Sequence, residues 1–146
     1  MQVTLKSIGT AHTDAQSIPR HWTVSDVEGT LVIDPAYTEA LSDIKSGQQI
    51  AVLFHFHKSP PFSPAFLKQT PPHRDRPFGL FSICSPKRPN PIGLSILEVM
   101  GRRENVLQVR WMDMIDGTPI LDIKPFIIDR DALPSREAPP KRDKNK

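Results

Sequence analysis

The sequence predicts a mainly β domain: a small, single-sheet β-barrel with one short helix. Two observations carry this prediction. About seven short runs with strand-like apolar patterns recur along the 146 residues, and turn-forming residues such as Gly, Pro, Asn or Asp bound most of them. Only one segment has the capping residues and the apolar stripe of a helix. Many short strands with a single helix are typical of a barrel.

The elements of the first half follow from hydrophobic patterning. Residues 3–9 alternate between apolar and polar and predict a first strand, whereas residues 10–27 are polar and rich in turn formers. Residues 28–33 predict a second strand. Asp34 is then placed to cap a short helix that starts at Pro35 and ends before Gly47. The apolar stripe of this helix consists of Ala36, Ala40, Leu41 and Ile44.

The second half is richer in strands. Residues 49–56 are strongly apolar and predict a central strand. Residues 58–77 contain six prolines and no strand pattern, so we expect a long functional or mobile loop. Further strands are predicted at residues 79–83, 92–100, 106–112 and 119–123, with a polar hairpin connection at residues 101–105 and a tight turn at Asp116 and Gly117.

Length and composition bound the class of protein. The length fits one domain, which we place at residues 1–128, followed by a basic and disordered tail at residues 129–146. The single Cys84 excludes an intramolecular disulfide framework and fits a reducing compartment. No apolar run reaches the roughly 20 residues of a membrane-spanning helix. The N-terminus lacks the pattern of a signal peptide, so we expect a cytoplasmic protein.

The most informative segment is residues 79–95. Three prolines lie between residues 86 and 91, and because proline fixes φ and lacks an N–H, this loop is stiff and its carbonyls are free. With Arg88, Asn90 and Gly93, it fits either a preorganised ligand-binding loop or an ordinary connection between strands. Residues 58–103 hold eight Lys or Arg against two acidic residues. This charge favours an anionic partner such as nucleic acid, although solvated surface is the alternative.

Histidine and cysteine residues near this loop fit more than one role. His55 and His57 share one face of a strand, and with His73 or Cys84 they could ligate a metal. The chain lacks a metal-ligand spacing, so hydrogen-bonding or ligand-contacting histidines are favoured and no metal is predicted. Cys84 could act as a nucleophile beside a base, but a buried or pocket-lining cysteine is favoured.

A second polar cluster interrupts the last apolar strands. Asp113, Asp122 and Lys124 would be expensive to bury without partners. Each therefore either belongs to a structural ion pair or faces a pocket.

Two motifs in this order resemble one family. Residues 85–95 read Ser-Pro-Lys-Arg-Pro-Asn-Pro-Ile-Gly-Leu-Ser, and residues 113–126 read Asp-Met-Ile-Asp-Gly-Thr-Pro-Ile-Leu-Asp-Ile-Lys-Pro-Phe. Together they closely resemble the TsaA-like, TrmO-type family of S-adenosylmethionine-dependent tRNA methyltransferases. The likeness extends from about residue 8 to about residue 126.

The resemblance implies a β-barrel methyltransferase that does not have a Rossmann fold, which agrees with the lack of a GxGxxG motif. It implies a homodimer with the cofactor, S-adenosyl-L-methionine, near the subunit interface. The implied reaction is methyl transfer to the exocyclic nitrogen of N6-threonylcarbamoyladenosine, next to the tRNA anticodon.

The resemblance also implies which residues form the site. Asn90, Asp122 and Lys124 are the candidate catalytic residues, without a firm general base. Cys84 stands where arginine is common and His21 where glutamine is usual, so the cofactor pocket lacks one expected charge. The implied cofactor contacts are Pro19, Arg20, His21, His57, Lys58, Cys84, Arg88, Leu94, Arg110, Trp111, Met112 and Asp113.

Two other functions stay open. The first is a sensor module that binds S-adenosylmethionine or a nucleotide without catalysis, which the loss of the arginine at position 84 favours. The second is a methyltransferase of the same fold that acts on another acceptor.

Overall fold

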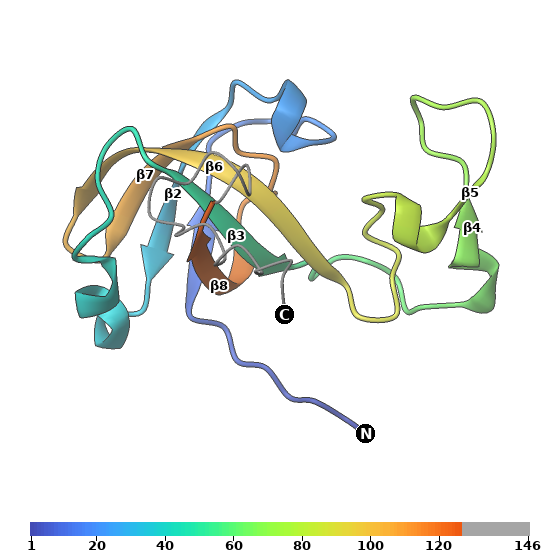
Figure 1. Cartoon of the computed structure of the whole chain (residues 1–146), viewed down its shortest axis with the longest axis horizontal. Coiled ribbons are helices and arrows are strands. Elements are labelled where there is room, and N and C mark those ends of the chain that lie inside the picture. The colour runs from blue at the N-terminus through green and yellow to red at the C-terminus, as the bar shows by residue number, and fades with distance from the viewer. Residues whose placement is uncertain (127–146) are drawn as a thin grey trace, which may run out of the picture.

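Six antiparallel strands close into a barrel (Figure 1). The computed structural model describes residues 1–126, and the tail predicted at residues 129–146 lies outside the described residues. Neighbouring strands follow the order β1-β2-β7-β6-β3-β8, and β8 closes the barrel by pairing with β1. The predicted β-barrel is confirmed. Its strands are β1 (Gly9–His12), β2 (Glu28–Ile33), β3 (Gln49–His55), β6 (Ile92–Arg103), β7 (Val106–Arg110) and β8 (Thr118–Pro125).

The hydrophobic core fills the barrel with side chains from all six strands. Successive side chains of a strand point to opposite faces, so alternate residues enter the interior. Each fully buried Val, Leu, Ile or Phe contributes about 1.5–3 kcal/mol by leaving water. The interior side chains of the strands include Ala11, Leu31, Ile33, Ile50, Val52, Phe54, Leu97, Val99, Leu107, Val109 and Ile120.

The predicted helix is present as the 3₁₀ helix η2 (Pro35–Leu41). The Asp34 carboxylate caps it by accepting a hydrogen bond from the Ala36 amide at 3.0 Å. Of its residues only Leu41 is fully buried, so the predicted apolar stripe has little core to pack on, and short 3₁₀ helices suit such edge positions. Three further 3₁₀ turns were not predicted: η1 (Trp22–Val24), η3 (Pro64–Leu67) and η4 (Leu80–Ser82).

The strand predicted at residues 3–9 is wrong. Strand β1 begins only at Gly9, and the side chains of Val3 and Leu5 are exposed. Within this segment only Gly9, the first residue of β1, and Ile8 reach the barrel, and the Ile8 amide donates to the Ile120 carbonyl at 2.8 Å. The other residues alternate in polarity but have no partner strand.

The barrel strands of the second half lie close to their predicted positions. Strand β6 is longer than predicted, because Arg102 and Arg103 stay in register with β7, and the hairpin connection shrinks to Glu104 and Asn105. Strand β7 ends at Arg110, because Trp111 turns into the left-handed region with φ 72°.

Three long connections meet at one end of the barrel, which we call the loop end. Residues 13–27 join β1 to β2, residues 56–91 join β3 to β6, and residues 111–117 join β7 to β8. The opposite end holds η2 and the short hairpin between β6 and β7. Since loops on a rigid barrel commonly carry function, the loop end is where a site is expected.

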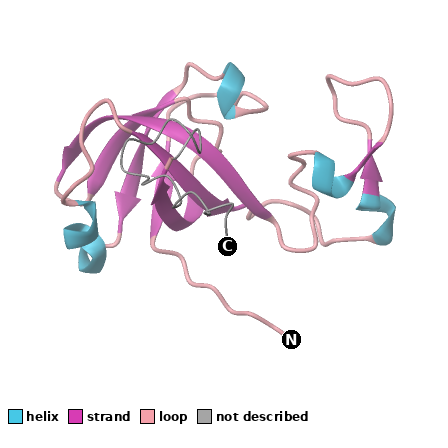
Figure 2. Ribbon diagram, viewed as in Figure 1, coloured by secondary structure: helices cyan, strands magenta, loops and turns pink. Residues whose placement is uncertain are grey.

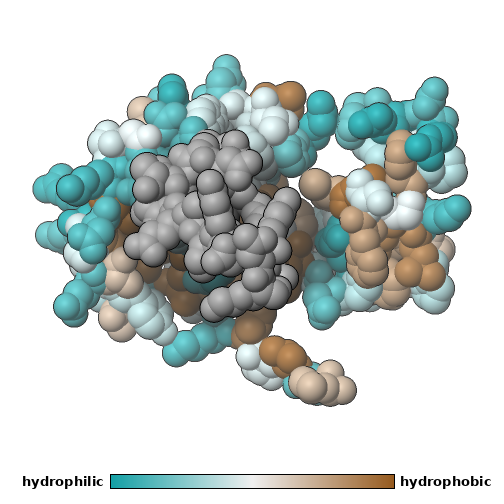
Figure 3. Space-filling model, viewed as in Figure 1, coloured by the Kyte–Doolittle hydropathy of each residue, from teal (hydrophilic) through white to brown (hydrophobic). Residues whose placement is uncertain are grey.

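Residues 56–91 form a lobe that projects sideways from the barrel (Figures 1 and 2). The lobe contains η3, η4 and a two-stranded sheet of β4 (Lys68–Gln69) and β5 (Phe78–Gly79). The strand predicted at residues 79–83 is therefore wrong apart from Gly79. Phe81 falls in η4 with 84% of its surface exposed, and apolar surface gathers over part of the lobe in Figure 3.

Candidate functional site

A cavity of about 580 Å³ lies where the lobe faces residues 20–21 of the first long connection. This volume falls within the range of small-molecule sites. Residues 22–68 separate the two walls along the chain, so the fold brings the walls together. The lining residues are Arg20, His21, Gln69, Thr70, Pro71, Pro72, His73, Arg74, Phe78, Ser82, Ile83, Cys84, Ser85, Pro86 and Lys87.

The lining of this cavity is cationic. It contains Arg20, Arg74 and Lys87 together with His21 and His73, and no lining residue is acidic. Partial desolvation and the neighbouring positive charges of Arg20 and Arg74 lower the pKa of His73. The cavity is thus suited to an anionic or electron-rich ligand.

Arg88 holds the predicted Pro-rich loop in shape. Its guanidinium donates from Nη1 to the carbonyl oxygens of Ile83 at 2.9 Å, Ser85 at 3.3 Å and Leu80 at 3.4 Å. These three carbonyl oxygens are not paired with a neighbouring β-strand. Hydrogen bonds from the Arg88 guanidinium take the place of the backbone hydrogen bonds that a strand would supply. Asn90 lies on the surface of the same loop.

Gln69 connects two segments of the lobe, the one around Phe66 and the Pro-rich loop around Ser85 and Lys87. Its side-chain amide donates to the carbonyls of Phe66 at 2.7 Å and Lys87 at 3.1 Å. Its oxygen accepts a hydrogen bond from the Ser85 hydroxyl at 2.5 Å. The lobe side of the cavity is therefore built by side chains and does not depend on a long sheet.

Asp113 is a half-buried carboxylate near residues 20–22, the first two of which form one wall of the cavity. The Ser95 hydroxyl, fully buried in β6, donates to its Oδ1 at 2.5 Å. Burial raises the pKa of Asp113, while Ser95, the His21 ring and the Trp22 amide oppose that rise. His21 lines the cavity and lies near enough to Asp113 to influence the pKa of that carboxyl group.

The backbone after β7 directs Asp113 to this position. A positive φ is unusual for a residue as bulky as Trp111 and marks a sharp turn. Beyond the turn, the Met112 amide donates to the Val27 carbonyl at 2.9 Å, and its carbonyl accepts from the Ser25 hydroxyl at 2.5 Å. The Met112 side chain is fully buried in the core, so only its backbone faces the loop end.

Arg110 and Trp111 form a cross-strand cluster next to this turn. The Arg110 guanidinium pairs with the Glu98 carboxylate at 2.8 Å. It also lies 5.3 Å from the centre of the Trp111 ring. Arg110 has an acidic partner, whereas the cavity cations form no ion pair with any other residue among 1–126.

The remaining predicted site residues lie apart from the cavity lining. His57 and Lys58 begin the lobe, and Leu94 is 55% exposed on the outer face of β6. Asp122 and Lys124 on β8 form an ion pair at 2.8 Å. Pro19 directly precedes the lining residue Arg20.

Several lining residues were missed from the sequence. Residues 58–77 were expected to be a long functional or mobile loop, and His73 was considered only as a metal ligand. Gln69, Arg74 and Phe78 were not predicted as residues of a site, although the clustered Arg, His and Pro residues were a usable signal. Ser95, the partner of Asp113, was also missed. Within residues 1–126, no group of three or more His, Cys, Asp or Glu could hold a metal. The described part of the chain has no helix long and apolar enough to cross a membrane.

A closed antiparallel barrel whose loop end carries a cationic cavity and a half-buried carboxylate defines a small β-barrel protein with a built ligand site. The chain belongs to the family of the tRNA-methyltransferase O N-terminal domain, whose profile matches residues 7–132. This membership confirms the family that the two sequence motifs resembled.

Individual relatives support the family. An S-adenosyl-L-methionine-binding protein of Archaeoglobus fulgidus is 36% identical over 115 residues, which cover 79% of this chain and 81% of the relative. A probable S-adenosyl-L-methionine-binding protein of Pyrococcus abyssi is 38% identical, covering 73% of this chain and 56% of the relative. The tRNA (adenine(37)-N6)-methyltransferase of Mus musculus is 37% identical, covering 64% of this chain and 22% of the relative.

Solved structures agree with the fold. The crystal structure of TrmO from Pseudomonas aeruginosa matches 94% of this chain with a TM-score of 0.70 and 27% identity. A second TrmO crystal structure matches with a TM-score of 0.71 and 29% identity. The chain spans only 62% and 61% of those two chains, respectively.

Proposed function

We propose that this protein is an S-adenosylmethionine-dependent tRNA methyltransferase that acts in the cytoplasm as a homodimer. Its acceptor is the exocyclic nitrogen of N6-threonylcarbamoyladenosine beside the anticodon. The observation that carries the proposal is the meeting of Arg20, His21 and Asp113 at the loop end. These residues come from two distant segments, and all three are cofactor contacts that the family resemblance implies.

The residues at the loop end fit the functional groups of S-adenosylmethionine. The Asp113 carboxylate, held by Ser95, can accept hydrogen bonds from hydroxyl or amino groups. Arg20 and Lys87 can pair with a carboxylate, and Phe78 offers an apolar surface. Cys84 lines the cavity without a charge, so carboxylate recognition here falls on Arg20 and Lys87.

In the proposed reaction, S-adenosylmethionine supplies an activated methyl group. The methyl group leaves the sulfonium sulfur and bonds to the acceptor nitrogen, which gives up its proton. Alignment of the reacting atoms can supply most of the rate enhancement. In this proposal Asn90 and Arg88 shape the loop that frames the acceptor. Asp122 and Lys124 pair with each other on β8, apart from the cavity of their own chain, so their predicted catalytic role stays a prediction that this proposal does not use.

Transfer of labelled methyl groups tests the proposal directly. The substrate is total tRNA from cells that possess the threonylcarbamoyl modification and from cells that lack it. We expect label only in the modified tRNA. Label in both samples would indicate another acceptor base, and label in neither would refute the methyltransferase. Asn90→Ala should reduce transfer while S-adenosylmethionine still binds, and unchanged transfer by this variant would overturn the role of the loop.

A non-catalytic sensor is the second candidate, and one observation favours it. Cys84 lines the cavity where the family commonly has arginine, so one charge that could act on the cofactor is lost. Tight binding of S-adenosylmethionine without transfer to either tRNA sample would favour the sensor. Restoring the charge with Cys84→Arg should increase methyl transfer if the protein is an enzyme.

A further inference from the structure

The lobe presents a set of cations that the cofactor proposal does not use in full. Residues 56–91 contain six Lys or Arg and a single acidic residue, Asp75. Arg20, His73, Arg74 and Lys87 line the cavity, and Arg76 lies beside them over the ring of the lining residue Phe78. We call these five residues the cationic rim.

The cations of the rim are free to meet a ligand. All five rim side chains belong to exposed residues. Among residues 1–126, none of them belongs to an ion pair, whereas Arg110 and Lys124 on the barrel both have acidic partners. Binding an anion at the rim therefore breaks no ion pair within the described part of the chain, so little electrostatic free energy is lost from that part.

Aromatic rings hold three of these cations in place. The Arg76 guanidinium lies 3.9 Å and that of Arg74 5.6 Å from the centre of the Phe78 ring. The Lys87 ammonium lies 5.2 Å from the centre of the Phe66 ring. Stacking of this kind restrains a long side chain while its N–H donors remain available. The rim is thus partly preorganised for phosphate oxygens.

The number and spread of the charges favour a polyanion. S-adenosylmethionine has one carboxylate, which one or two cations satisfy. The rim offers four permanent cations and one histidine, and they come from three separate segments of chain. A nucleic acid backbone carries a phosphate at every nucleotide and can engage such a spread surface.

We propose that the cationic rim binds the phosphate backbone of the substrate RNA and so positions a nucleotide at the mouth of the cavity. This inference rests on the proposed function, because it assigns the RNA contact of that same site. Four of the five rim residues line the cavity proposed for the cofactor, so RNA bound there lies next to the methyl donor.

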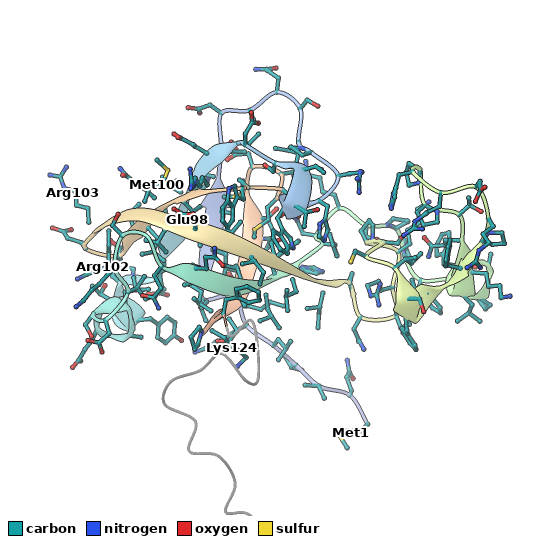
Figure 4. All side chains as sticks on the ribbon, turned by 45° about the horizontal axis from the view of Figure 1, so that its top comes forward. Met1, Glu98, Met100, Arg102, Arg103 and Lys124 are labelled. Atoms are coloured by element: carbon teal, nitrogen blue, oxygen red, sulfur yellow. The ribbon has the colours of Figure 1, made fainter. Side chains whose placement is uncertain are left out.

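The test is the salt dependence of tRNA binding by the full chain, measured by fluorescence anisotropy with labelled total tRNA. The rim variant carries Arg74→Gln and Arg76→Gln. The matched control carries Arg102→Gln and Arg103→Gln, which remove the same charge from the hairpin at the far end from the lobe (Figure 4). S-adenosylmethionine affinity of each variant is measured in parallel by calorimetry.

We expect the rim variant to bind tRNA roughly tenfold more weakly, with a salt slope lower by about 1–2. The control should stay within about twofold of the wild type for tRNA and should keep its cofactor affinity. The rim variant should lose less cofactor affinity than tRNA affinity, because recognition of the cofactor carboxylate is assigned to Arg20 and Lys87. Equal effects in the two variants would overturn the proposal, because net charge alone would then explain them. Loss of cofactor affinity with normal tRNA binding would also overturn it.

Two further outcomes keep the proposals distinguishable. If the wild type transfers methyl to tRNA and the rim variant binds tRNA normally, only the rim is refuted. If the wild type binds no tRNA even at low salt, both the rim proposal and the proposed tRNA methyltransferase function are refuted. Should the double variant fail to fold, Arg76→Gln alone removes one rim charge at a residue outside the cavity lining and should lower the slope by about 1.

Discussion

Asp113 is a carboxylate whose surroundings disfavour its charged form. Burial raises the pKa of Asp113, even though the Ser95 hydroxyl donates a hydrogen bond to the carboxylate. Asp116, three residues later, has the opposite environment, because the Thr13 amide and the His12 ring stabilise its charge. A protein gains nothing in stability from a charged group that burial opposes, so a binding role accounts best for Asp113.

The pH dependence of stability should therefore differ in sign between these two residues. The folded-state pKa of Asp113 lies above its reference value of 3.8. Its contribution to stability is complete below about pH 3.8 and is lost as pH rises through the raised pKa. The stability of the wild type relative to Asp113→Asn should thus increase as pH falls from 7 toward 4.

Asp116→Asn is the matched control for this measurement. The pKa of Asp116 lies below 3.8, so its contribution is present above that value and is lost as pH falls through the lowered pKa. Urea unfolding across the pH range checks both signs. The same sign for both variants would contradict this account of Asp113.

At neutral pH, Asp113→Asn should also weaken S-adenosylmethionine binding by about tenfold or more, as expected for the loss of a charged hydrogen-bonding partner.

Strand β6 shows how packing dictates the sequence of the Pro-rich motif. Gly93 faces into the barrel, where the Phe54 ring packs directly on the backbone. A Cβ atom at this position would lie 2.3 Å from the nearest atom of that ring. The glycine of the motif is thus required by the core, while its neighbours Ile92 and Leu94 face outward.

Gly93→Ala should consequently destabilise the protein by about 1–3 kcal/mol, because the Phe54 ring has to move within a close-packed core. Gly79→Ala is the control, since Gly79 has an ordinary φ of −60° and no atom within 4 Å of an added Cβ. Thermal denaturation should show a lower midpoint for the first variant and little change for the second. Equal midpoints would mean that β6 can shift away from the ring.

Strands that enter the core were predicted correctly from the sequence, whereas exposed apolar segments were wrongly predicted as strands. Strand β2 was predicted at its observed bounds, because its apolar residues enter the core in register with two neighbours. Residues 3–9 and 79–83 have apolar residues too, but no partner strand buries Val3 or Phe81. Apolar patterning reveals a strand only where a neighbouring strand exists, and the sequence contains no information on that pairing by itself.

The candidate site was predictable to a similar degree. The resemblance selected Arg20 and His21, which line the cavity, and Asp113, which lies near His21. It did not select His73 or Arg74, because their approach to residue 20 depends on how the whole lobe folds back. A cavity whose two walls are separated along the chain by residues 22–68 is a property of the tertiary structure.

The molecule as a whole presents apolar surface in two places. The lobe carries Phe81 at 84% and Leu67 at 53% exposure, and the outer face of β6 carries Leu94 at 55%. The lobe stands away from the barrel (Figure 1), so these surfaces are not covered by the described part of the chain. Exposed apolar patches of this kind mark interaction surfaces. A second copy of the chain, which the proposed homodimer supplies, would cover them.

Phe81→Asp should therefore weaken the dimer. A large aromatic anchor at an interface is worth about 2 kcal/mol or more, so the dimer dissociation constant should rise about 30-fold or more. Met100→Asp is the control, because Met100 is also an exposed apolar residue, at 42%, but lies toward the hairpin end of β6, away from the lobe. Sedimentation velocity over a concentration series should show monomer for the first variant and dimer for the second.

Because the implied cofactor contact Leu94 lies outside the cavity lining of its own chain, the loss of the dimer should also reduce methyl transfer. A wild type that is monomeric yet fully active would refute the homodimer and show that one chain completes the site.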